Sequence, residues 1–317
     1  MFKNLYNQAS IVFNIKPVSP LLIKTGKESF DPTRPDMEFV RTMTPYGEVP
    51  YLPGSSLKGV IRSYGERILR TLNLKCCDVT LKQGGCKIES ENMEERYQKH
   101  CYICRTFGST SLSSRMRITD ANPWWIEAED EEIKKVATSI DDYISTSRRT
   151  SVKIDRQKGA AAGGALFETE VVTGGNFWGE ITLVNYQLWQ LALLSLILRD
   201  INRGFQRVGA SKSRGLGRVT FKIERSQIQQ YGKLASGEDN LCGIACLGDT
   251  AIDRYGLVKE DLLSFLPGEI QWDSDNSVPG FVDIFNFGVD PDKDWSFLAK
   301  SLVEGTSWKC LQEEGDS

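Results

Sequence analysis

The sequence predicts an α+β fold in which one β-sheet carries helices and long insertions. Three observations support this prediction: β-prone segments lie near both ends of residues 1–230, two segments between them have helical periodicity, and a cysteine-containing insertion separates those two. The chain has 317 residues, enough for one large or two modest domains, and 40% of them are hydrophobic. This composition is that of an ordinary globular protein.

The first predicted elements are a strand, a long loop and a helix. Residues 9–16 are apolar and β-prone, which predicts the strand. Residues 25–50 contain four prolines and predict a loop, and loops of this length often have a function. Ser55 or Ser56 can cap the helix, over about residues 56–72, because apolar residues then recur at helical spacing: Leu57, Val60, Ile61, Tyr64 and Ile68.

The later elements are a second helix, over about residues 187–200, and a strand over residues 218–224. Further on, Leu262, Leu263 and Phe265 before Pro267 suggest a small helix. The order strand, helix, insertion, helix, strand is compatible with a ferredoxin-like sheet that carries insertions.

The charge is distributed unevenly along the chain. The net charge is −3, but residues 231–317 hold 6 basic and 17 acidic residues, which leaves 33 basic and 25 acidic residues in 1–230. The first part, with a net charge of +8, can attract a polyanion, whereas the second, with −11, would repel one. We therefore expect a domain over 1–230 and an acidic C-terminal extension over 231–317, which serves either solubility or contact with a protein partner.

Several classes of protein are disfavoured. The N-terminus lacks the apolar core of a signal peptide, and no apolar run reaches the length of a membrane span, so we expect a cytoplasmic protein without a membrane partner. The single histidine, His100, excludes a two-histidine ribonuclease mechanism and leaves Ser-His or Cys-His catalysis poorly supported.

Two motifs suggest phosphate binding. The glycine-rich run over 204–218 combines flexible backbone with four cations, and a solvated surface turn is the alternative. The run over 53–59 places two hydroxyls and free amides at a helix N-terminus, where plain capping is the alternative. The predicted contacts are Ser55, Ser56, Lys58, Arg62, Arg207, Lys212, Arg214 and Arg218.

The cysteines predict a metal site. Five of the eight lie between Cys76 and Cys104, and the Cys-x-x-Cys pair of Cys101 and Cys104 is typical of half a tetrahedral zinc site. Cys86 and either Cys76 or Cys77 would complete it, and His100 could replace a cysteine. We select Cys77, Cys86, Cys101 and Cys104 as ligands of a structural Zn²⁺; buried unliganded thiols are the alternative.

Two further segments are candidates for function. Residues 143–170 are basic and glycine-rich, and they predict a hairpin that could lie across a nucleic acid through Arg148, Lys153 and Arg156, unless it is merely solvated. The proline-rich loop carries Asp31 and Asp36, either of which could hold a metal ion or orient a nucleophile, although Asp-Pro is also common in turns.

Taken in order, these motifs resemble the RAMP (repeat-associated mysterious protein) backbone subunits of type III CRISPR effector complexes. The resemblance covers roughly residues 8–225 and includes residues 50–59, 101–109, 114–120, 153–156, 166–170 and the glycine-rich run. The cysteines before Cys104-Arg-Thr-Phe-Gly look like the zinc-containing, type III-D branch of this group.

The resemblance implies a modified RNA-recognition-motif core with a zinc insertion at about 74–105 and a thumb hairpin at about 120–170. It adds Arg115 and Arg117 to the expected RNA contacts. Partners would be CRISPR RNA, target RNA, other RAMP subunits and the large signature subunit. In cleaving members a loop aspartate promotes metal-dependent cutting by the RNA's own 2′-hydroxyl; Asp36 fits that position best and Asp31 second, with Mg²⁺ or Mn²⁺ as cofactor.

Three functions remain open on this resemblance. The first is a backbone subunit that binds CRISPR RNA and cleaves target RNA. The second is an inactive binding or capping subunit of the same complex. The third is an endoribonuclease that processes CRISPR RNA, against which the single histidine weighs.

Overall fold

The structure is a computed structural model. It describes residues 4–25, 34–78, 85–231, 240–247, 255–258, 260–264, 272–274, 282–287, 291–305 and 307–311. Within these residues, no helix has both the length and the apolar character needed to cross a membrane.

The centre of the molecule is a six-stranded sheet in the order β11-β12-β8-β1-β7-β4, and every neighbouring pair is antiparallel. The central strand β1 pairs with β8 along its whole length, interrupted by a bulge between Val12 and Phe13. Strand β7 alternates buried and half-buried residues, so one face of the sheet supplies the core. The strands are β1 (Asn7–Pro17), β4 (Met116–Ile118), β7 (Phe177–Val184), β8 (Val219–Tyr231), β11 (Trp272–Ser274) and β12 (Val282–Phe287).

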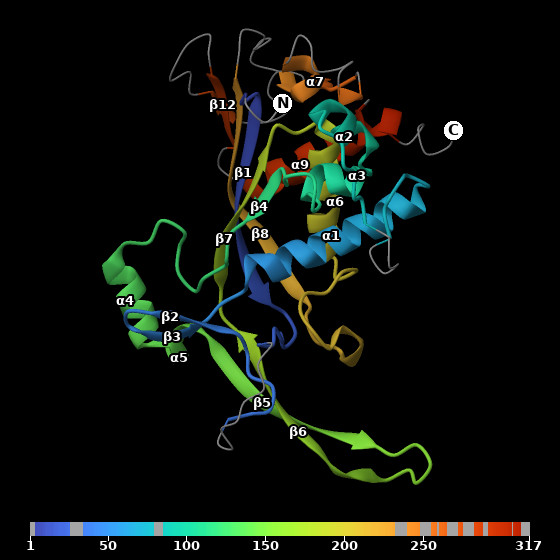
Figure 1. The fold of residues 1–317 in the computed structure, drawn as a ribbon. Helices are drawn as coiled ribbons and strands as arrows, with labels where there is room; N and C mark the ends of the chain where they lie inside the picture. Colours follow the sequence, from blue (N-terminus) through green and yellow to red (C-terminus); the bar gives the residue numbers. More distant parts are fainter. Residues whose placement is uncertain are drawn as a thin grey trace.

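Helices cover one face of this sheet (Figure 1). Helix α6 (Leu188–Asn202) is buried along most of its length, since it packs against β8 and against the helices α1 (Gly54–Thr71) and α9 (Pro291–Glu304). Helix α9 also contacts β8. The core is one cluster of apolar side chains that includes Phe13, Phe177 and Trp189. Along the chain, the elements of this layer follow the order β1, α1, β4, β7, α6, β8.

Short elements decorate this layer. The cysteine-containing insertion carries α2 (Met93–Lys99) and α3 (Tyr102–Phe107), and the glycine-rich run carries the 3₁₀ turn η1 (Lys212–Arg214). Figure 1 shows α4 (Asp130–Thr138) and α5 (Ile140–Tyr143) beside β2 (Arg41–Thr44) and β3 (Gly47–Pro50), away from the main helices. The remaining elements are β9 (Asn240–Cys242), α7 (Ile244–Leu247) and β10 (Leu262–Ser264).

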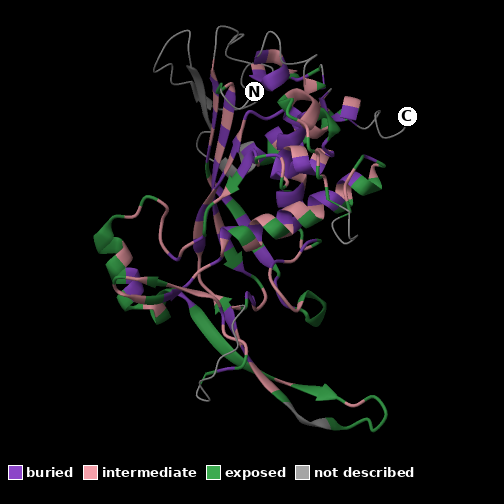
Figure 2. Ribbon diagram, in the orientation of Figure 1, coloured by how far each residue is buried: buried purple, intermediate pink, exposed green. Residues whose placement is uncertain are grey.

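A two-stranded hairpin projects from this body. It consists of β5 (Ser145–Ile154) and β6 (Ala161–Gly174), paired antiparallel from Ser145 opposite Gly174 to Ile154 opposite Ala161. Figure 2 shows it largely exposed, in contrast to the buried helical layer. A ribbon of two strands has no core of its own, so its order depends on its root.

The predicted mixed fold is confirmed: the structure combines helices with an antiparallel sheet. The strand at 9–16 and the helices at about 56–72 and 187–200 correspond to β1, α1 and α6. Two local predictions were wrong. The segment over 25–50, predicted to be a loop, contains the β2–β3 hairpin. Leu262–Ser264, predicted to be helical, is a strand, because its backbone pairs with β9.

A buried carboxylate is one of the contacts that join the described part of the acidic extension to the core. Asp261 accepts hydrogen bonds from the backbone N–H of Leu188, at 2.7 Å, and of Ala245, at 3.0 Å. Leu188 is the first residue of α6, so this contact satisfies a free N–H of the helix start. Burial raises the pKa of Asp261 to about 6. The division of the chain near residue 230 remains a prediction.

Candidate metal centre and nucleic-acid interface

Four cysteine side chains converge beside α1. Cys77 and Cys86 come from the insertion, Cys101 precedes α3 and Cys104 lies in its first turn. The four Sγ atoms all lie within 4.8 Å of one another. The three-residue spacing of Cys101 and Cys104 places both thiols on one side of the helix start, which is why this pair is typical of metal sites.

The donor set fits a zinc ion. Zinc–sulfur bonds of about 2.3 Å in a tetrahedron place the sulfur atoms about 3.8 Å apart. The Sγ atoms of Cys77 and Cys104 are 3.5 Å apart, close to this spacing. No two of the four Sγ atoms are more than 4.8 Å apart. Four thiolates leave no coordination position open, so an ion held here would be structural.

The alternative ligands lie outside this group. His100 is 1% exposed, with Nδ1 2.5 Å from the carbonyl oxygen of Arg96 and Nε2 2.7 Å from Oγ of Ser109. Both ring nitrogens therefore face protein atoms, and the imidazole braces the loop after α3. The Sγ of Cys76 lies 3.8 Å from the carbonyl oxygen of Cys77 and also contacts the thiol of Cys101, but Cys76 is not one of the four converging thiols.

The protonation of the thiols reflects their crowding. A hydrogen bond to Cys101 raises the pKa of Cys104, and burial raises that of Cys86 to about 11. Hydrogen bonds from Cys104 and Cys76 lower the pKa of Cys101, which makes Cys101 the thiolate that its neighbours stabilise. A divalent cation would reverse the trend for the other thiols, because metal coordination deprotonates a thiol outright.

Two of the predicted RNA-binding cations make contacts inside the chain, and one of them, Arg62, touches the cysteine centre. Arg62 donates to Glu66 and to the carbonyl of Gly108, and it lies 3.5 Å from Sγ of Cys104. Lys58 donates to Oγ of Ser114 at 2.8 Å and to the carbonyl of Met116 at 3.0 Å, and burial lowers its pKa. Both side chains thus hold α1 against the segment over 108–116.

A carboxylate from elsewhere in the chain lies at the start of α1. Asp120 accepts a hydrogen bond of 2.7 Å from the backbone N–H of Gly54, so a carboxylate of the chain occupies part of the helix N-terminus. Ser55 is exposed and Ser56 half-buried in the same turn. The sequence did not reveal Asp120 as the capping residue, since it lies 66 positions downstream.

The glycine-rich run folds back on residues near β1. Gly209 and Gly217 have φ of +81° and +83°, and an added Cβ would come within 2.3 Å of the carbonyl oxygen of Leu22 and 2.0 Å of that of Val208. Only glycine fits both the backbone angle and the space. The run therefore has a defined shape that depends on its glycines.

The cations of this run differ in their surroundings. Arg207 donates to the carbonyl oxygens of Lys212, at 3.5 Å, and Leu216, at 3.4 Å, so its guanidinium braces the loop from inside. Lys212, Arg214 and Arg218 have exposed side chains. The last three are therefore accessible to a ligand on this surface.

Of the two arginines near β4, one is exposed and one is not. Arg117 is exposed. Arg115 is 2% exposed and lies 4.7 Å from the centre of the Tyr97 ring. The expectation that Arg115 contacts RNA directly is therefore corrected: its guanidinium packs inside the protein between the insertion and the sheet, where a phosphate has no access.

Asp36 lies beside the middle of the projecting hairpin. Its carboxylate accepts a hydrogen bond of 2.8 Å from the backbone N–H of Glu168 in β6, and the side chain is exposed. Met37 continues this contact, with its N–H donating to the carbonyl of Glu168 and its own carbonyl accepting from Glu170. The predicted loop aspartate and the hairpin, far apart in sequence, thus meet. Asp31 lies outside the described residues.

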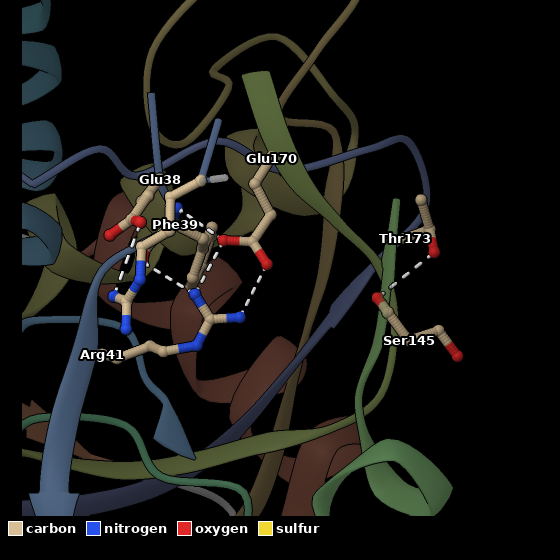
Figure 3. Close-up of polar contacts among 7 residues, drawn as sticks. Glu38, Phe39, Arg41, Ser145, Glu170 and Thr173 are labelled. Atoms are coloured by element: carbon tan, nitrogen blue, oxygen red, sulfur yellow. Dashed lines mark hydrogen bonds and ion pairs between the residues drawn. The ribbon is translucent and has the colours of Figure 1, made fainter. Parts of the chain in front are cut away.

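An ion pair secures this junction (Figure 3). Arg41 donates through both terminal nitrogens to the carboxylate of Glu170, at 2.7 and 2.6 Å, and the backbone N–H of Phe39 donates to the same carboxylate at 3.0 Å. Burial alone would raise the pKa of Glu170, but these hydrogen bonds lower it, and the bond to Glu170 raises that of Arg41. Sequence reading missed the pair because its members lie 129 positions apart.

The hairpin carries the remaining predicted cations. Arg148, Lys153 and Arg156 are all exposed, and Arg148 lies 4.0 Å from the carboxylate of Glu168. Apolar side chains are exposed beside them near the far end: Val152, Ile154 and Leu166. Cations next to exposed apolar groups are suited to contact both the phosphates and the bases of a nucleic acid.

A comparison with known protein families shows the family of this chain. Residues 14–220 match the model of the RAMP superfamily, which is more than half of the chain. The chain belongs to the RAMP superfamily. This RAMP protein is also similar to the CRISPR system Cms endoribonuclease Csm3 of Enterococcus italicus, with 27% identity over 229 residues. That similarity covers 69% of this chain and 92% of the Enterococcus protein.

Proposed function

We propose that this RAMP protein is a backbone subunit of a type III CRISPR effector complex that binds CRISPR RNA and cleaves target RNA. Family membership and the similarity to a protein named as a CRISPR endoribonuclease support the proposal. The observation that carries it furthest is the position of Asp36 beside the middle of the exposed basic hairpin.

The proposal assigns the described layer to a ferredoxin-like, modified RNA-recognition-motif core. In favour of it, the elements β1, α1, β4, β7, α6 and β8 follow one another along the chain, and their strands lie in the order β8-β1-β7-β4. This core would belong to a RAMP domain over 1–230, with the insertion at about 74–105 and the thumb at about 120–170. Residues 231–317 would be an extension that serves contacts beyond the RNA.

The guide RNA would be held by its phosphates. Lys212, Arg214 and Arg218 present exposed cations on a loop of fixed shape, and Ser55, Ser56 and Arg117 extend the surface. Lys58, Arg62 and Arg207 would act mainly by supporting these elements through their contacts inside the chain. Phosphate contacts carry no sequence information, so base recognition would rest on guide–target pairing.

The β5–β6 hairpin would act as the thumb. Its cations Arg148, Lys153 and Arg156 would contact the RNA backbone, and its apolar end would wedge beside a base and displace a nucleotide. The contacts of Asp36 with β6 would hold the carboxylate next to that nucleotide.

Cleavage would use the RNA itself as nucleophile. The 2′-oxygen would attack the adjacent phosphorus and displace the 5′-oxygen of the next nucleotide. The displaced oxygen would take a proton from water, which leaves a 2′,3′-cyclic phosphate and a 5′-hydroxyl. Asp36 would position the reacting phosphate region and receive the proton of the 2′-hydroxyl. Mg²⁺ or Mn²⁺, when bound, would neutralise charge on the phosphate; one carboxylate together with phosphate oxygens is a usual ligand set for such ions.

The cysteine centre would hold a structural Zn²⁺ through Cys77, Cys86, Cys101 and Cys104. Its contact with Arg62 would connect it to α1 and so to the guide-binding surface. The type III-D branch is the version of the family that this centre favours. Other RAMP subunits and the large signature subunit would be partners in the cytoplasm.

The alternative is an inactive binding or capping subunit on the same scaffold; processing of CRISPR RNA comes third. A reconstituted complex with guide and labelled target RNA distinguishes the first two. With Asp36→Ala we expect loss of cutting at the sites served by this subunit, with target binding retained. Asp31→Ala tests the second candidate.

The matched control is Asp142→Ala, which removes an exposed carboxylate on α5. It should leave cutting unchanged. If Asp36→Ala and Asp31→Ala both cut like the unmodified complex, or if the unmodified complex binds target without cutting it, the inactive subunit is the correct assignment.

A further inference from the structure

The end of helix α6 fixes the backbone of an aromatic residue. Arg203 caps the helix, and Gly204 follows it with φ of +80°. The N–H of Gly204 donates to the carbonyl oxygen of Ile201 at 3.0 Å. The N–H of Phe205 donates to the carbonyl oxygen of Asp200, also at 3.0 Å. These two hydrogen bonds form the Schellman motif that ends many helices, so the position of Phe205 is set by the helix itself.

The ring of Phe205 lacks the packing that usually accompanies this motif. An apolar residue at this position commonly contacts the last turn of its own helix. The residues that it would contact are Arg199 and Asp200, an ion pair of 2.9 Å, so the turn offers no apolar partner. Phe205 is 67% exposed, the highest value among the aromatic side chains that the structure describes. The ring is therefore available to a planar group of a ligand.

Exposed cations contact the residues before and after Phe205. A Cβ added to Gly204 would lie 3.3 Å from Nε of Arg218. Arg67 of α1 donates to Oε1 of Gln206 at 2.7 Å. Both arginine side chains are exposed, and neither forms an ion pair with another described residue. A positive charge thus lies on each side of Phe205 along the chain.

A further cation lies close to Arg67. The guanidinium of Arg67 rests on the ring of Tyr64, 4.6 Å from its centre, which holds it in place. Partial burial lowers the pKa of Lys212, and the charge of Arg67 lowers it further. Lys212 also forms no ion pair within the described part of the chain. An anion bound at these two cations would offset their mutual repulsion.

We propose that Phe205 stacks on an unpaired base of the guide RNA, whose neighbouring phosphates bind Arg218 on one side and Arg67 with Lys212 on the other. The inference rests on the proposed function, because it requires that the chain bind RNA. Bases alternate with phosphates along a single strand, and this surface presents a cation, a ring and further cations in the same order. A duplex would reach the cations alone, because its bases are stacked on one another. An acidic peptide or a polyphosphate would have no base for the ring.

Filter binding of the full chain to a short single-stranded RNA, at several salt concentrations, tests this role. In Phe205→Ala we expect a loss of about fivefold or more, because base–aromatic stacking is removed. Phe205→Trp, which keeps a ring, should bind like the unmodified chain. The slope of affinity against salt should stay unchanged in Phe205→Ala, since stacking releases no counterions, and should decrease in Arg67→Ala.

Inorganic polyphosphate, used as a competitor, separates the ring from the cations. Its affinity should be unchanged in Phe205→Ala and lower in Arg67→Ala. Phe205→Ala should also keep the thermal melting of the unmodified protein, because the side chain is exposed. The matched control is Phe297→Ala, which removes an exposed ring on α9 and should not alter RNA binding.

Three outcomes would count against the proposal. If Phe205→Ala binds RNA as tightly as Phe297→Ala does, the ring has no role and this inference fails alone. If Phe205→Ala loses RNA and polyphosphate equally, the ring only shapes the loop, and stacking is again excluded. If the unmodified chain binds no RNA, the proposed function fails together with the inference.

Discussion

The helical layer and the projecting hairpin are built on opposite principles. Helix α6 is buried on nearly every side, with Trp189 and Leu193 fully enclosed, whereas β5 is exposed at almost every position. The layer is held by its own apolar contacts and by residues of the extension such as Asp261. The hairpin is held along part of its length, where the segment over 34–41 contacts Glu168 and Glu170 of β6.

The comparison separates stability from recognition. Residues that fix the fold are buried and pair with other residues of the chain, while most of the proposed RNA contacts are exposed and lie on elements that contribute little to the core. Changes in the layer should therefore unfold the protein, and changes on the hairpin should alter binding alone. The following variants are ordered from the largest expected effect to the smallest.

Loss of the cysteine centre should have the largest effect. Cys104→Ser removes one of four converging thiols, and the protein should lose about one zinc ion per chain and about 4 kcal/mol or more of its free energy of unfolding. Native mass spectrometry and chemical denaturation measure the two quantities. Cys246→Ser, outside the cluster, should keep the metal. A folded, unmodified protein without zinc would refute the assignment.

Truncation of the layer comes next. Leu193→Ala in α6 leaves a cavity in a fully buried site and should cost about 2–5 kcal/mol in the free energy of unfolding. Val152→Ala on the exposed hairpin serves as its counterpart and should change stability by less than about 0.5 kcal/mol. Urea denaturation measures both. Equal losses in the two variants would contradict the division between layer and hairpin.

Disruption of the contact between Arg41 and the hairpin should have a local effect. Glu170→Gln replaces the carboxylate that binds Arg41 and should free β5 and β6 while the layer stays folded. The partly buried pair is expected to contribute about 1–3 kcal/mol to the docking of the hairpin. Hydrogen exchange of the backbone amides of β6 should accelerate, whereas amides of α6 should not. In Arg34→Ala, which breaks an exposed pair with Glu38, neither set should change.

Removal of the hairpin cations should leave stability unchanged. Arg148→Ala/Lys153→Ala/Arg156→Ala should weaken RNA binding about tenfold and reduce its dependence on salt, because three phosphate contacts are lost. Filter binding at several salt concentrations measures both. A matched triple variant at exposed lysines elsewhere, Lys75, Lys135 and Lys309, should bind as before. If the two triple variants behave alike, the hairpin has no special role in binding.

The spacing of residues along the chain predicted those elements that depend on residues close together in sequence. The helical spacing of Leu57, Ile61 and Ile68 led to α1, and the Cys-x-x-Cys spacing led to the metal centre, since each depends on residues within one or two turns. The hairpin at 145–174 also followed from its glycine-rich middle. Family resemblance added the loop aspartate.

Features that depend on distant contacts were not predicted. Asp120 caps α1 from 66 positions away, and Arg41 meets Glu170 across 129 positions. Arg115 is spaced like a surface cation beside Arg117, yet it is buried against Tyr97. The sequence also gave no indication that β12 would extend the sheet at β8, because the edge of a sheet is chosen by tertiary packing.

The central claim is that the chain holds RNA by its backbone, through the exposed cations of the glycine-rich run. The direct measurement is the affinity for two RNAs of unrelated sequence, across a range of salt, for the unmodified chain and for Lys212→Ala/Arg214→Ala/Arg218→Ala. We expect equal affinities for both RNAs, a steep loss with salt, and a parallel fall of about tenfold or more for both in the variant. A tenfold preference for one sequence, or a variant that binds like the unmodified chain, would contradict the claim.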